Sequence, residues 1–561
     1  MSVPVKRPEI IADGFPPRRP RWVEIATSAD HKDLGRILIT GSLGFLFIAL
    51  VELLLMRLQL AIPENTFLDP VTFNRMLSLY GATAIFLFAV PLALGFFYYV
   101  TPLQIGARGM ALPHFGQLGV WLYIAGATVL YSGFLFTPTE AGVNPLAPLS
   151  SLAFLPNNGV DAWAAATGLA TLGFVLIAID LVATLRKLRA PGMAWRRLPV
   201  FSWAAAISSW LLLVIGPVML AALTMLLIDR NFEGIFFSGE AGGSPLLWQH
   251  LSWIFFTGSY MLVLIFALGT IAEIVPAMAR KPLFNRGAVI GSLVAIAIVG
   301  TAAWMQNMFT APIGIGWMYF AMAMSLALIV PFGLVFFNLI ATLVGGTARM
   351  RAPLLFAAGA IAAIAVGLAS EVSHSMVALG WRLQHTTDST AATHFALVGG
   401  AVFGGFAALH WWFPKMTGRT MGETLARMSF WTMVLGTLLA FVPLFLAGAE
   451  EGQVVDAYKF FSGGAIDTYN LIATIGAFLL AAGIVMTLVN AILSREGGAA
   501  TGHDPWGGDS LEWLALSPPD PHNFDVLPDV RSPRPMRDIR EAISRRTRRA
   551  EQPARESQPV A

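Results

Sequence analysis

The polar side chains that could do chemistry inside the apolar stretches of this chain are few and far apart. Gln306 and Asn307 are adjacent within one such stretch, and His394 lies in another. Amides are poor ligands for first-row transition metals, but they can join a buried hydrogen-bond network. A histidine in such a stretch is a candidate functional residue. We favour hydrogen bonding over a metal site for the amide pair, and for His394 a ligand role and a hydrogen bond between helices stay equal alternatives.

Helices that cross a membrane must position these groups. The chain has 561 residues, of which 56% are hydrophobic and 12% are charged, a composition typical of membrane proteins. Lipid offers no hydrogen-bond partner to backbone groups, so we predict an all-α integral membrane bundle. Apolar runs of roughly 20 residues, the length that crosses a bilayer, recur about twelve times, near 37–57, 81–101, 117–136, 162–185, 202–228, 248–272, 288–310, 315–344, 354–379, 391–413, 428–448 and 469–494.

Three parts are predicted along the chain. Residues 1–35 form a polar N-terminal segment without the apolar core of a cleaved secretory signal. Residues 36–495 form the membrane domain, and residues 496–561 form a Pro/Arg-rich tail that we expect to be extended or disordered, a docking strip at most. Lys and Arg gather in alternate loops, which predicts that both termini are cytoplasmic. We expect the bacterial inner membrane.

Charge and cysteine content exclude several kinds of site. The net charge of +3 comes largely from the predicted inner segments, so it reflects topology and does not predict nucleic-acid binding. The chain has no cysteine, which excludes disulfides, thiolate metal sites and iron–sulfur clusters. Any bound metal would need His, carboxylate, Met or carbonyl ligands.

Several segments together resemble subunit I of the haem-copper oxidases, the terminal oxidases of aerobic respiration. The similar segments follow one another in order along nearly the whole chain. They are His31-Lys-Asp-Leu-Gly35, Pro102-Leu-Gln-Ile-Gly-Ala107, Met110-Ala-Leu-Pro113, Asp229-Arg-Asn-Phe232, Gly242-Gly-Ser-Pro-Leu-Leu-Trp-Gln-His250, Trp411-Trp-Phe-Pro-Lys-Met-Thr-Gly418, Asn470-Leu-Ile-Ala-Thr-Ile-Gly-Ala-Phe478 and Pro505-Trp-Gly-Gly-Asp-Ser-Leu-Glu-Trp513.

The resemblance implies a particular metal chemistry. In that family oxygen is reduced at a haem iron facing a copper ion, and a second, six-coordinate haem passes electrons in. This implies six histidine ligands, because neutral imidazole is the usual protein ligand for such iron and copper. This chain departs from that set at nearly every position.

The haem positions of the resemblance lie in the second and tenth spans. Tyr80 stands where the family has a histidine, and we interpret it as an interfacial aromatic near a helix end rather than as a haem ligand. His394-Phe395-Ala396 stands where the family has His-Phe-His. The resemblance places His394 at the ligand of the high-spin haem and Ala396 at the second ligand of the low-spin haem. At most one haem is expected, through His394.

The copper positions lie in the sixth and seventh spans. Thr257 replaces a copper-ligand histidine, and Ser259 and Met261 replace the proton-carrying Glu and the Tyr bonded to that histidine. Gln306 and Asn307 replace the adjacent histidine pair. We therefore do not expect copper, and we assign no catalytic residue.

Other positions that the resemblance makes important are also changed. Val335 stands where the family has a proton-path Lys, and Gly109 where it has the acid that opens the other proton path. The segment 448–456, with Glu450 and Glu451, stands where paired Arg grip the haem propionates. The positive guanidinium of Arg binds the carboxylate of a propionate, whereas the negative side chain of Glu repels it. Together these changes suggest a vacated cofactor cavity.

Three functions are left open. We favour a subunit of a respiratory membrane complex that cannot by itself reduce oxygen and has a structural, assembly or regulatory role. Its partners would be subunit II/III-like membrane proteins and a second, full-histidine subunit I. The alternative is an active terminal oxidase subunit 1 that passes electrons from cytochrome c or quinol to oxygen. A third function is ligand binding or transport in a cavity lined by Thr257, Ser259, Gln306, Asn307 and His394.

Overall fold

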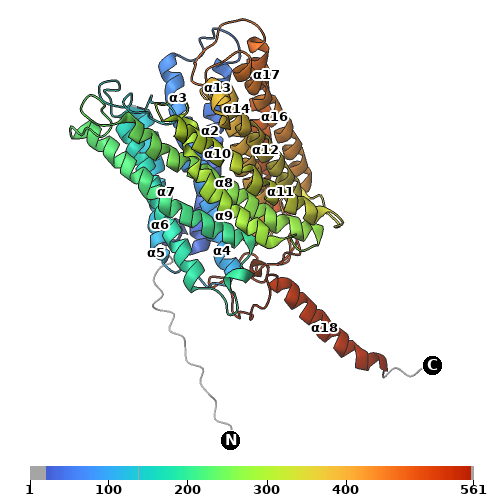
Figure 1. Ribbon diagram of the computed structural model, residues 1–561. Helices are drawn as coiled ribbons and strands as arrows, with labels where there is room; N and C mark the ends of the chain where they lie inside the picture. The colour runs from blue at the N-terminus through green and yellow to red at the C-terminus, as the bar shows by residue number, and fades with distance from the viewer. Residues whose placement is uncertain (1–20, 137, 557–561) are drawn as a thin grey trace.

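The computed structural model of the protein describes residues 21–136 and 138–556. Figure 1 shows long, tilted helices gathered in one bundle, from which α18 projects at one end. The helices are α1 (Arg21–Thr27), α2 (His31–Gln59), α3 (Pro70–Ala82), η1 (Thr83–Ala89), α4 (Val90–Ile105), α5 (Pro113–Phe136), α6 (Gly159–Lys187), η2 (Trp195–Arg197), α7 (Val200–Asn231), α8 (Pro245–Ala279), α9 (Arg286–Ala302), η3 (Trp304–Met308), α10 (Ile315–Ala327), α11 (Ile329–Leu343), α12 (Ala352–Ser375), α13 (Val377–Leu383), α14 (Thr387–Leu397), η4 (Val398–Phe403), α15 (Gly404–Thr417), α16 (Glu423–Ala449), α17 (Ile466–Gly497), η5 (Leu511–Trp513) and α18 (Pro535–Glu556).

The predicted membrane architecture is confirmed. In the part of the chain that the structure describes, 11 helical stretches are long and apolar enough to cross a membrane. The 24-residue apolar helix α5 stands at the remaining predicted span. The same described residues contain no strand, only two isolated bridges, Thr386 with Val454 and Arg419 with Ala500. The fold is the all-helical bundle expected from hydropathy, because only a helix satisfies its own backbone groups in lipid.

Two of the predicted spans are not single continuous α-helices. The span predicted over residues 288–310 is helical only to Ala302, and a short 3-10 segment, η3, follows and carries Gln306 and Asn307. The amides therefore lie within the predicted span, in the 3-10 segment at its end and outside its α-helical part. The span predicted over 315–344 is divided at Leu328 into α10 and α11.

Two long helices change to π-helical turns in their middle. α3 continues through η1 into α4, and α14 continues through η4 into α15. π-helical turns inside α-helices occur frequently at functional sites. The first run begins at Pro70 rather than at residue 81, so Tyr80 lies within a continuous helix. The prediction that Tyr80 is near a helix end is wrong.

The described part of the tail packs against the bundle as a mostly irregular strip, so the expectation of a docking strip holds and that of disorder is wrong. The Lys415 ammonium donates to the carbonyl of Ala515 over 2.7 Å, and the Trp506 indole donates to the carbonyl of Trp411 over 2.9 Å. Glu512 and Trp513 are buried. Buried tryptophans contribute large apolar area, which a count of Pro and Arg in the sequence does not reveal.

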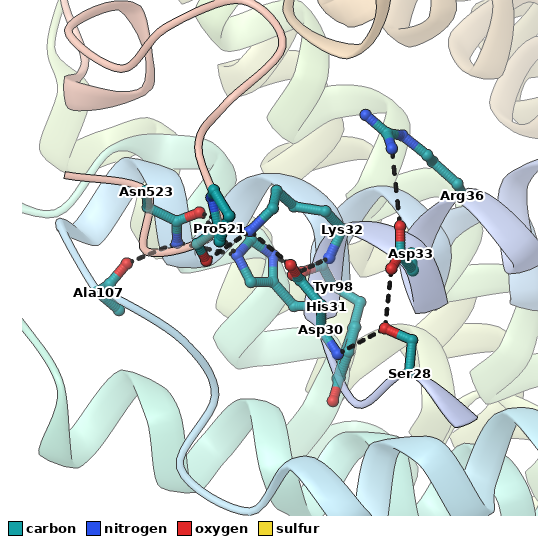
Figure 2. A network of polar contacts seen from close by, with 10 residues as sticks. All are labelled: Ser28, Asp30, His31, Lys32, Asp33, Arg36, Tyr98, Ala107, Pro521 and Asn523. Atoms are coloured by element: carbon teal, nitrogen blue, oxygen red, sulfur yellow. Dashed lines mark hydrogen bonds and ion pairs between the residues drawn. The ribbon is translucent and has the colours of Figure 1, made fainter. Parts of the chain in front are cut away.

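Figure 2 shows how the tail is tied to the start of α2. The Asn523 amide donates to His31 Nε2 over 2.9 Å and to the carbonyl of Ala107 over 2.8 Å. Lys32 Nζ donates to Asn523 Oδ1 over 3.1 Å and to the carbonyl of Pro521 over 3.0 Å. The histidine and lysine of the N-terminal motif thus join three distant segments and have a structural role here.

Replacing Asn523 should release this part of the tail. Asn523→Ala removes the partner of His31, Lys32 and Ala107, and Asn523 has a φ of 62°, which alanine adopts less readily than asparagine. We expect a local loss of about 2 kcal/mol, measured as faster hydrogen exchange over residues 500–534. His522→Ala, at the neighbouring exposed position, is the control. Equal protection in the two variants would contradict this structural role.

Glu512 makes the docking of the tail depend on pH. Burial raises the pKa of the Glu512 carboxyl, although Gln104 and Ser510 donate hydrogen bonds to it. At a pH between the two pKa values, Glu512 holds a proton in the folded protein that it has released in the unfolded chain. Docking of the tail therefore weakens as pH rises from the unfolded pKa through the folded pKa. We expect Glu512→Gln to remove this dependence, seen as tail protection that no longer falls between acidic and alkaline pH. A fall as steep as that of the unmodified protein would contradict the assignment.

Candidate functional site

Tyr80 and His394 are brought into direct contact, although 314 residues separate them in the sequence. The Tyr80 hydroxyl lies 2.7 Å from His394 Nε2. The two rings are parallel to within 2°, with centroids 5.9 Å apart. Tyr80 comes from α3 and His394 from α14, and each lies shortly before the π-helical turn of its helix. The hydrogen bond between helices that was one alternative for His394 is therefore present.

The proton positions of His394 follow from its two partners. His394 Nδ1 lies 2.8 Å from the carbonyl oxygen of Thr390. A carbonyl only accepts, so Nδ1 carries the proton and Nε2 of the neutral ring carries the lone pair that accepts from Tyr80. An iron or other Lewis acid would bind that same lone pair. A metal ion that binds this nitrogen must displace the Tyr80 hydroxyl.

Ala396 points elsewhere. It packs against α12, where a methyl group added to Gly367 would lie 3.2 Å from Ala396 Cβ. Successive residues are about 100° apart around a helix, so positions 394 and 396 are about 200° apart. They cannot both face Tyr80. Ala396, expected at a second-ligand position, does not oppose Tyr80, and His394 does.

The bond between Tyr80 and His394 gives a direct test. Tyr80→Phe keeps the ring and leaves the His394 lone pair without its donor. We expect the free energy of unfolding to fall by about 1 kcal/mol, measured by denaturant titration in detergent. Tyr319→Phe, at an exposed position on α10, is the matched control. A loss no larger than that of the control would contradict the contact.

Gln306 is the centre of a second polar cluster. Its amide nitrogen donates to Glu371 of α12 over 2.5 Å, and its amide oxygen accepts from Ser325 of α10. Ser375 Oγ lies 3.5 Å from the same oxygen, and Gln384 donates to the Gln306 carbonyl over 3.3 Å. The hydrogen-bond network expected of this amide is confirmed. The network joins η3 to α10, to α12 and to Gln384, the residue after α13.

Asn307 bonds in the other direction, toward α8. Its amide donates to Thr257 Oγ1 and to the carbonyl of Trp304, each over 3.3 Å. The Trp304 indole donates to His250 Nδ1 over 3.1 Å. Thr257, Gln306 and Asn307, which the sequence placed in one site, thus do lie in one hydrogen-bonded region. The Asn307 amide nitrogen is engaged with Thr257, and both amide atoms of Gln306 are engaged with neighbouring helices.

Glu371 is the site residue that the sequence reasoning missed. It stands in the polar last turns of α12, near Ser370, Ser373 and His374, and is half-buried. An ionisable residue within a membrane span is a functional candidate by default, so that signal was present. What the sequence did not reveal is that its partner would be Gln306.

The remaining predicted positions are spread over neighbouring helices. Ser259 is buried, and its hydroxyl has no hydrogen-bond partner among the described residues. Met261 packs against Gly300 of α9. Val335 is fully buried in α11. These side chains fill space between helices, and only Ser259 retains an unused polar atom.

The acidic loop before α17 is used locally. Glu450 accepts a hydrogen bond of 2.8 Å from the Tyr469 hydroxyl, and Glu451 accepts one of 3.3 Å from the backbone of Ala465. In the neighbouring segment the carboxylate of Asp388 lies 2.8 Å from His374 Nε2. The loop acids therefore hold the start of α17, and no arginine stands at either of these two positions.

Comparisons with known proteins find one family over most of the chain. Residues 33–479 match the family described as cytochrome c and quinol oxidase polypeptide I. The chain is 35% identical to cytochrome c oxidase subunit 1 of Bacillus subtilis over 513 residues, covering 91% of this chain and 82% of that protein. It is 36% identical to a probable cytochrome c oxidase subunit 1-beta of Nocardia farcinica over 542 residues, covering 95% and 90%.

Two further similarities extend the comparison. The quinol oxidase subunit 1 of Bacillus spizizenii is 33% identical over 515 residues, which cover 91% of this chain and 79% of that protein. The cryo-EM structure of a haem-copper terminal oxidase dimer superposes with a TM-score of 0.71, covering 83% of this chain and 85% of that one. Its sequence identity is 14%, so this likeness concerns the fold.

Proposed function

The chain belongs to the cytochrome c and quinol oxidase polypeptide I family, and within that family we propose that it is a member unable by itself to reduce oxygen. It is an integral membrane protein of the haem-copper oxidase subunit I type. Its proposed role is structural, in assembly, or regulatory, in a respiratory membrane complex. The observation that carries the proposal is that Gln306 and Asn307 stand at the implied copper position with their amide nitrogens donating hydrogen bonds to Glu371 and Thr257.

The donor set at the proposed copper position does not fit copper. Thr257 offers a hydroxyl, and Gln306 and Asn307 offer amides, whereas first-row transition metals in proteins prefer imidazole or thiolate. The amide nitrogens have no lone pair to give, and the Gln306 amide oxygen already accepts from Ser325. A metal here would break these bonds and gain weak ligands in return. We derive no chemistry through copper for this chain.

The haem position fits better, through one residue. His394 would hold a haem through Nε2, the nitrogen that here bonds to the Tyr80 hydroxyl. We therefore propose His394 as the residue that would hold a haem, with Tyr80 as its neighbour in that position. A haem held by His394 would supply electron transfer. The Tyr80 hydroxyl competes for the same nitrogen, so such binding is expected to be weak.

The test uses the full chain, purified in mild detergent with whatever subunits accompany it. We expect less than one haem per chain in the optical spectrum, no stoichiometric copper by mass spectrometry of the metal, and no oxygen consumption with reduced cytochrome c or quinol. Any haem signal should be lost in His394→Ala and kept in His114→Ala, which changes an exposed histidine. Two haems and one copper per chain would overturn the proposal.

The alternative remains an active terminal oxidase subunit 1. It is supported by identities of 35–36% to curated cytochrome c oxidase subunits over more than nine-tenths of the chain. The same metal and activity measurements decide between the two. Oxygen consumption that survives in the purified protein and is abolished by His394→Ala would favour the alternative.

Partners and topology are proposed on the same basis. We propose association with subunit II/III-like membrane proteins and with a second, full-histidine subunit I, which gentle purification and mass spectrometry of the complex would detect. We also propose that residues 1–35 and 496–561 both lie on the cytoplasmic side of a bacterial inner membrane around the membrane domain 36–495. Lys and Arg in alternate loops support this orientation. Reporter fusions at the two ends would test it, and an end found outside would contradict it.

A further inference from the structure

A deep groove runs along the outside of the bundle between α2, α15 and α17. It has a volume of about 1240 Å³, more than the roughly 300–1,000 Å³ typical of small-molecule sites. Its walls are apolar over most of their length, formed by residues such as Ile37, Leu43, Phe47, Leu488 and Ile492. Phe47 and Ile492 are 48% and 72% exposed. No described side chain covers these two residues, so their apolar surface is available to a ligand.

The length of the groove matches one leaflet of a bilayer. On α2 its lining extends from Ile37 to Phe47, and on α17 from Val485 to Arg495. Ten residues of helix rise about 15 Å, which is half of the roughly 30 Å hydrocarbon core of a membrane. An occupant with acyl chains of one leaflet would therefore fill the groove from its polar end to the middle of the bilayer.

Charged residues of both signs stand together at one end of the groove. Arg36 and Asp33 lie at the start of α2, Glu24 lies on α1, and Arg495 lies near the end of the antiparallel helix α17. The other lining residues are uncharged. Two cations and two anions sum to zero, so this end does not select a net negative headgroup. It matches a headgroup that carries a phosphate and an ammonium group together.

Arg36 is already held in place for such a contact. One guanidinium nitrogen donates to the carbonyl of Met416 over 3.1 Å, and another lies 3.7 Å from Asp33 Oδ1. The guanidinium carbon also lies 5.7 Å from the centre of the Tyr99 ring. An arginine held by three contacts loses little further freedom when it binds an anion. Arg495, by contrast, is exposed on the opposite wall.

We propose that this groove binds a phospholipid whose headgroup carries both a phosphate and a primary ammonium group. The phosphate lies between Arg36 and Arg495, the ammonium group lies against Asp33 and Glu24, and the acyl chains follow the apolar walls of α2 and α17. A quaternary ammonium headgroup cannot donate hydrogen bonds to the carboxylates, and a glycerol headgroup offers no cation to them. The site is on the outside of the bundle and is independent of the cofactor positions.

Gly44 allows the groove to be filled without disturbing the fold. It lies on α2 within the groove lining, and a Cβ added there would meet no atom within 4 Å. Gly44→Phe therefore places a ring in the space of the acyl chains. Gly291→Phe is the matched control, because Gly291 is also an exposed helical glycine with open space, on α9, outside the groove.

The experiment is lipid titration of the delipidated full-length protein, followed by native mass spectrometry. Phosphatidylethanolamine, phosphatidylcholine and phosphatidylglycerol of identical acyl chains are compared. We expect phosphatidylethanolamine to be retained about fivefold better than either of the others, since each charged group contributes roughly 1 kcal/mol near a membrane surface. Gly44→Phe should abolish this preference and Gly291→Phe should keep it. Arg495→Glu should weaken it, and Arg186→Glu, an exposed arginine at the end of α6, should not.

Three results would overturn the proposal. The first is equal retention of the three lipids. The second is an equal effect of Gly44→Phe and Gly291→Phe. The third is a polypeptide that cross-links from position 492 in the intact complex and shields the groove, because the occupant would then be another subunit.

Discussion

Gln306→Ala is expected to lower the free energy of unfolding by about 2 kcal/mol. The substitution removes hydrogen bonds to Glu371, Ser325 and Ser375 at once. Hydrogen bonds between membrane helices contribute about 0.6 kcal/mol on average, and bonds to charged groups contribute about 1.5–3 kcal/mol. The loss should therefore exceed that of a typical membrane hydrogen bond, since the half-buried Glu371 is left without its amide donor. Unfolding of the purified protein by denaturant in mixed micelles measures it.

Two further variants show whether the pairing itself is responsible. Glu371→Gln keeps a side chain of the same shape that can still accept from Gln306, so its loss should be smaller. In a Glu371→Ala background, Gln306→Ala should cost less than in the unmodified protein, because the partner has already gone. Equal costs in both backgrounds would show that Gln306 and Glu371 act independently, contrary to the structure.

Gly476→Ala is expected to destabilise the protein more, by about 3 kcal/mol. Gly476 of α17 packs directly against the backbone of α16, and an added Cβ would lie 2.7 Å from Ala440 Cα and closer still to its nitrogen. Gly436 of α16 makes the reciprocal approach, with its added Cβ 2.6 Å from Leu480 Cα. Backbone atoms cannot rotate away, so the two helices must separate. Close approach through small residues is a usual way in which membrane helices associate.

The control for this prediction is Gly333→Ala. Gly333 is an exposed glycine of α11 around which an added Cβ meets no atom within 4 Å. Alanine is the better helix former, so Gly333→Ala should be neutral or slightly stabilising. Folded protein recovered after detergent extraction, together with its unfolding midpoint, distinguishes the two substitutions. A midpoint for Gly476→Ala equal to that of Gly333→Ala would be inconsistent with the packing of α16 on α17.

Hydropathy predicted most of the architecture. Runs of apolar residues identified the positions of the membrane helices, because the requirement to satisfy backbone groups in lipid acts on each segment separately. The errors fell where a local pattern did not decide the outcome. Beyond Ala302 the chain remains largely apolar, yet it forms a 3-10 segment. The tail has a polar composition, yet buried Glu512, Trp513 and Asn523 dock it onto the bundle.

Several residues of the candidate site were predicted from the sequence, but their pairing, and the part played by Glu371, were not. The sequence alone determined which residue types are available: a phenol at Tyr80, one imidazole at His394, and amides at Gln306 and Asn307. Only the tertiary structure decided that Tyr80 bonds to His394 while Ala396 turns to α12, and that Gln306 bonds to Glu371. Partners across a bundle depend on the rotation and depth of each helix, which arise from packing against several neighbours at once. No single span carries that information.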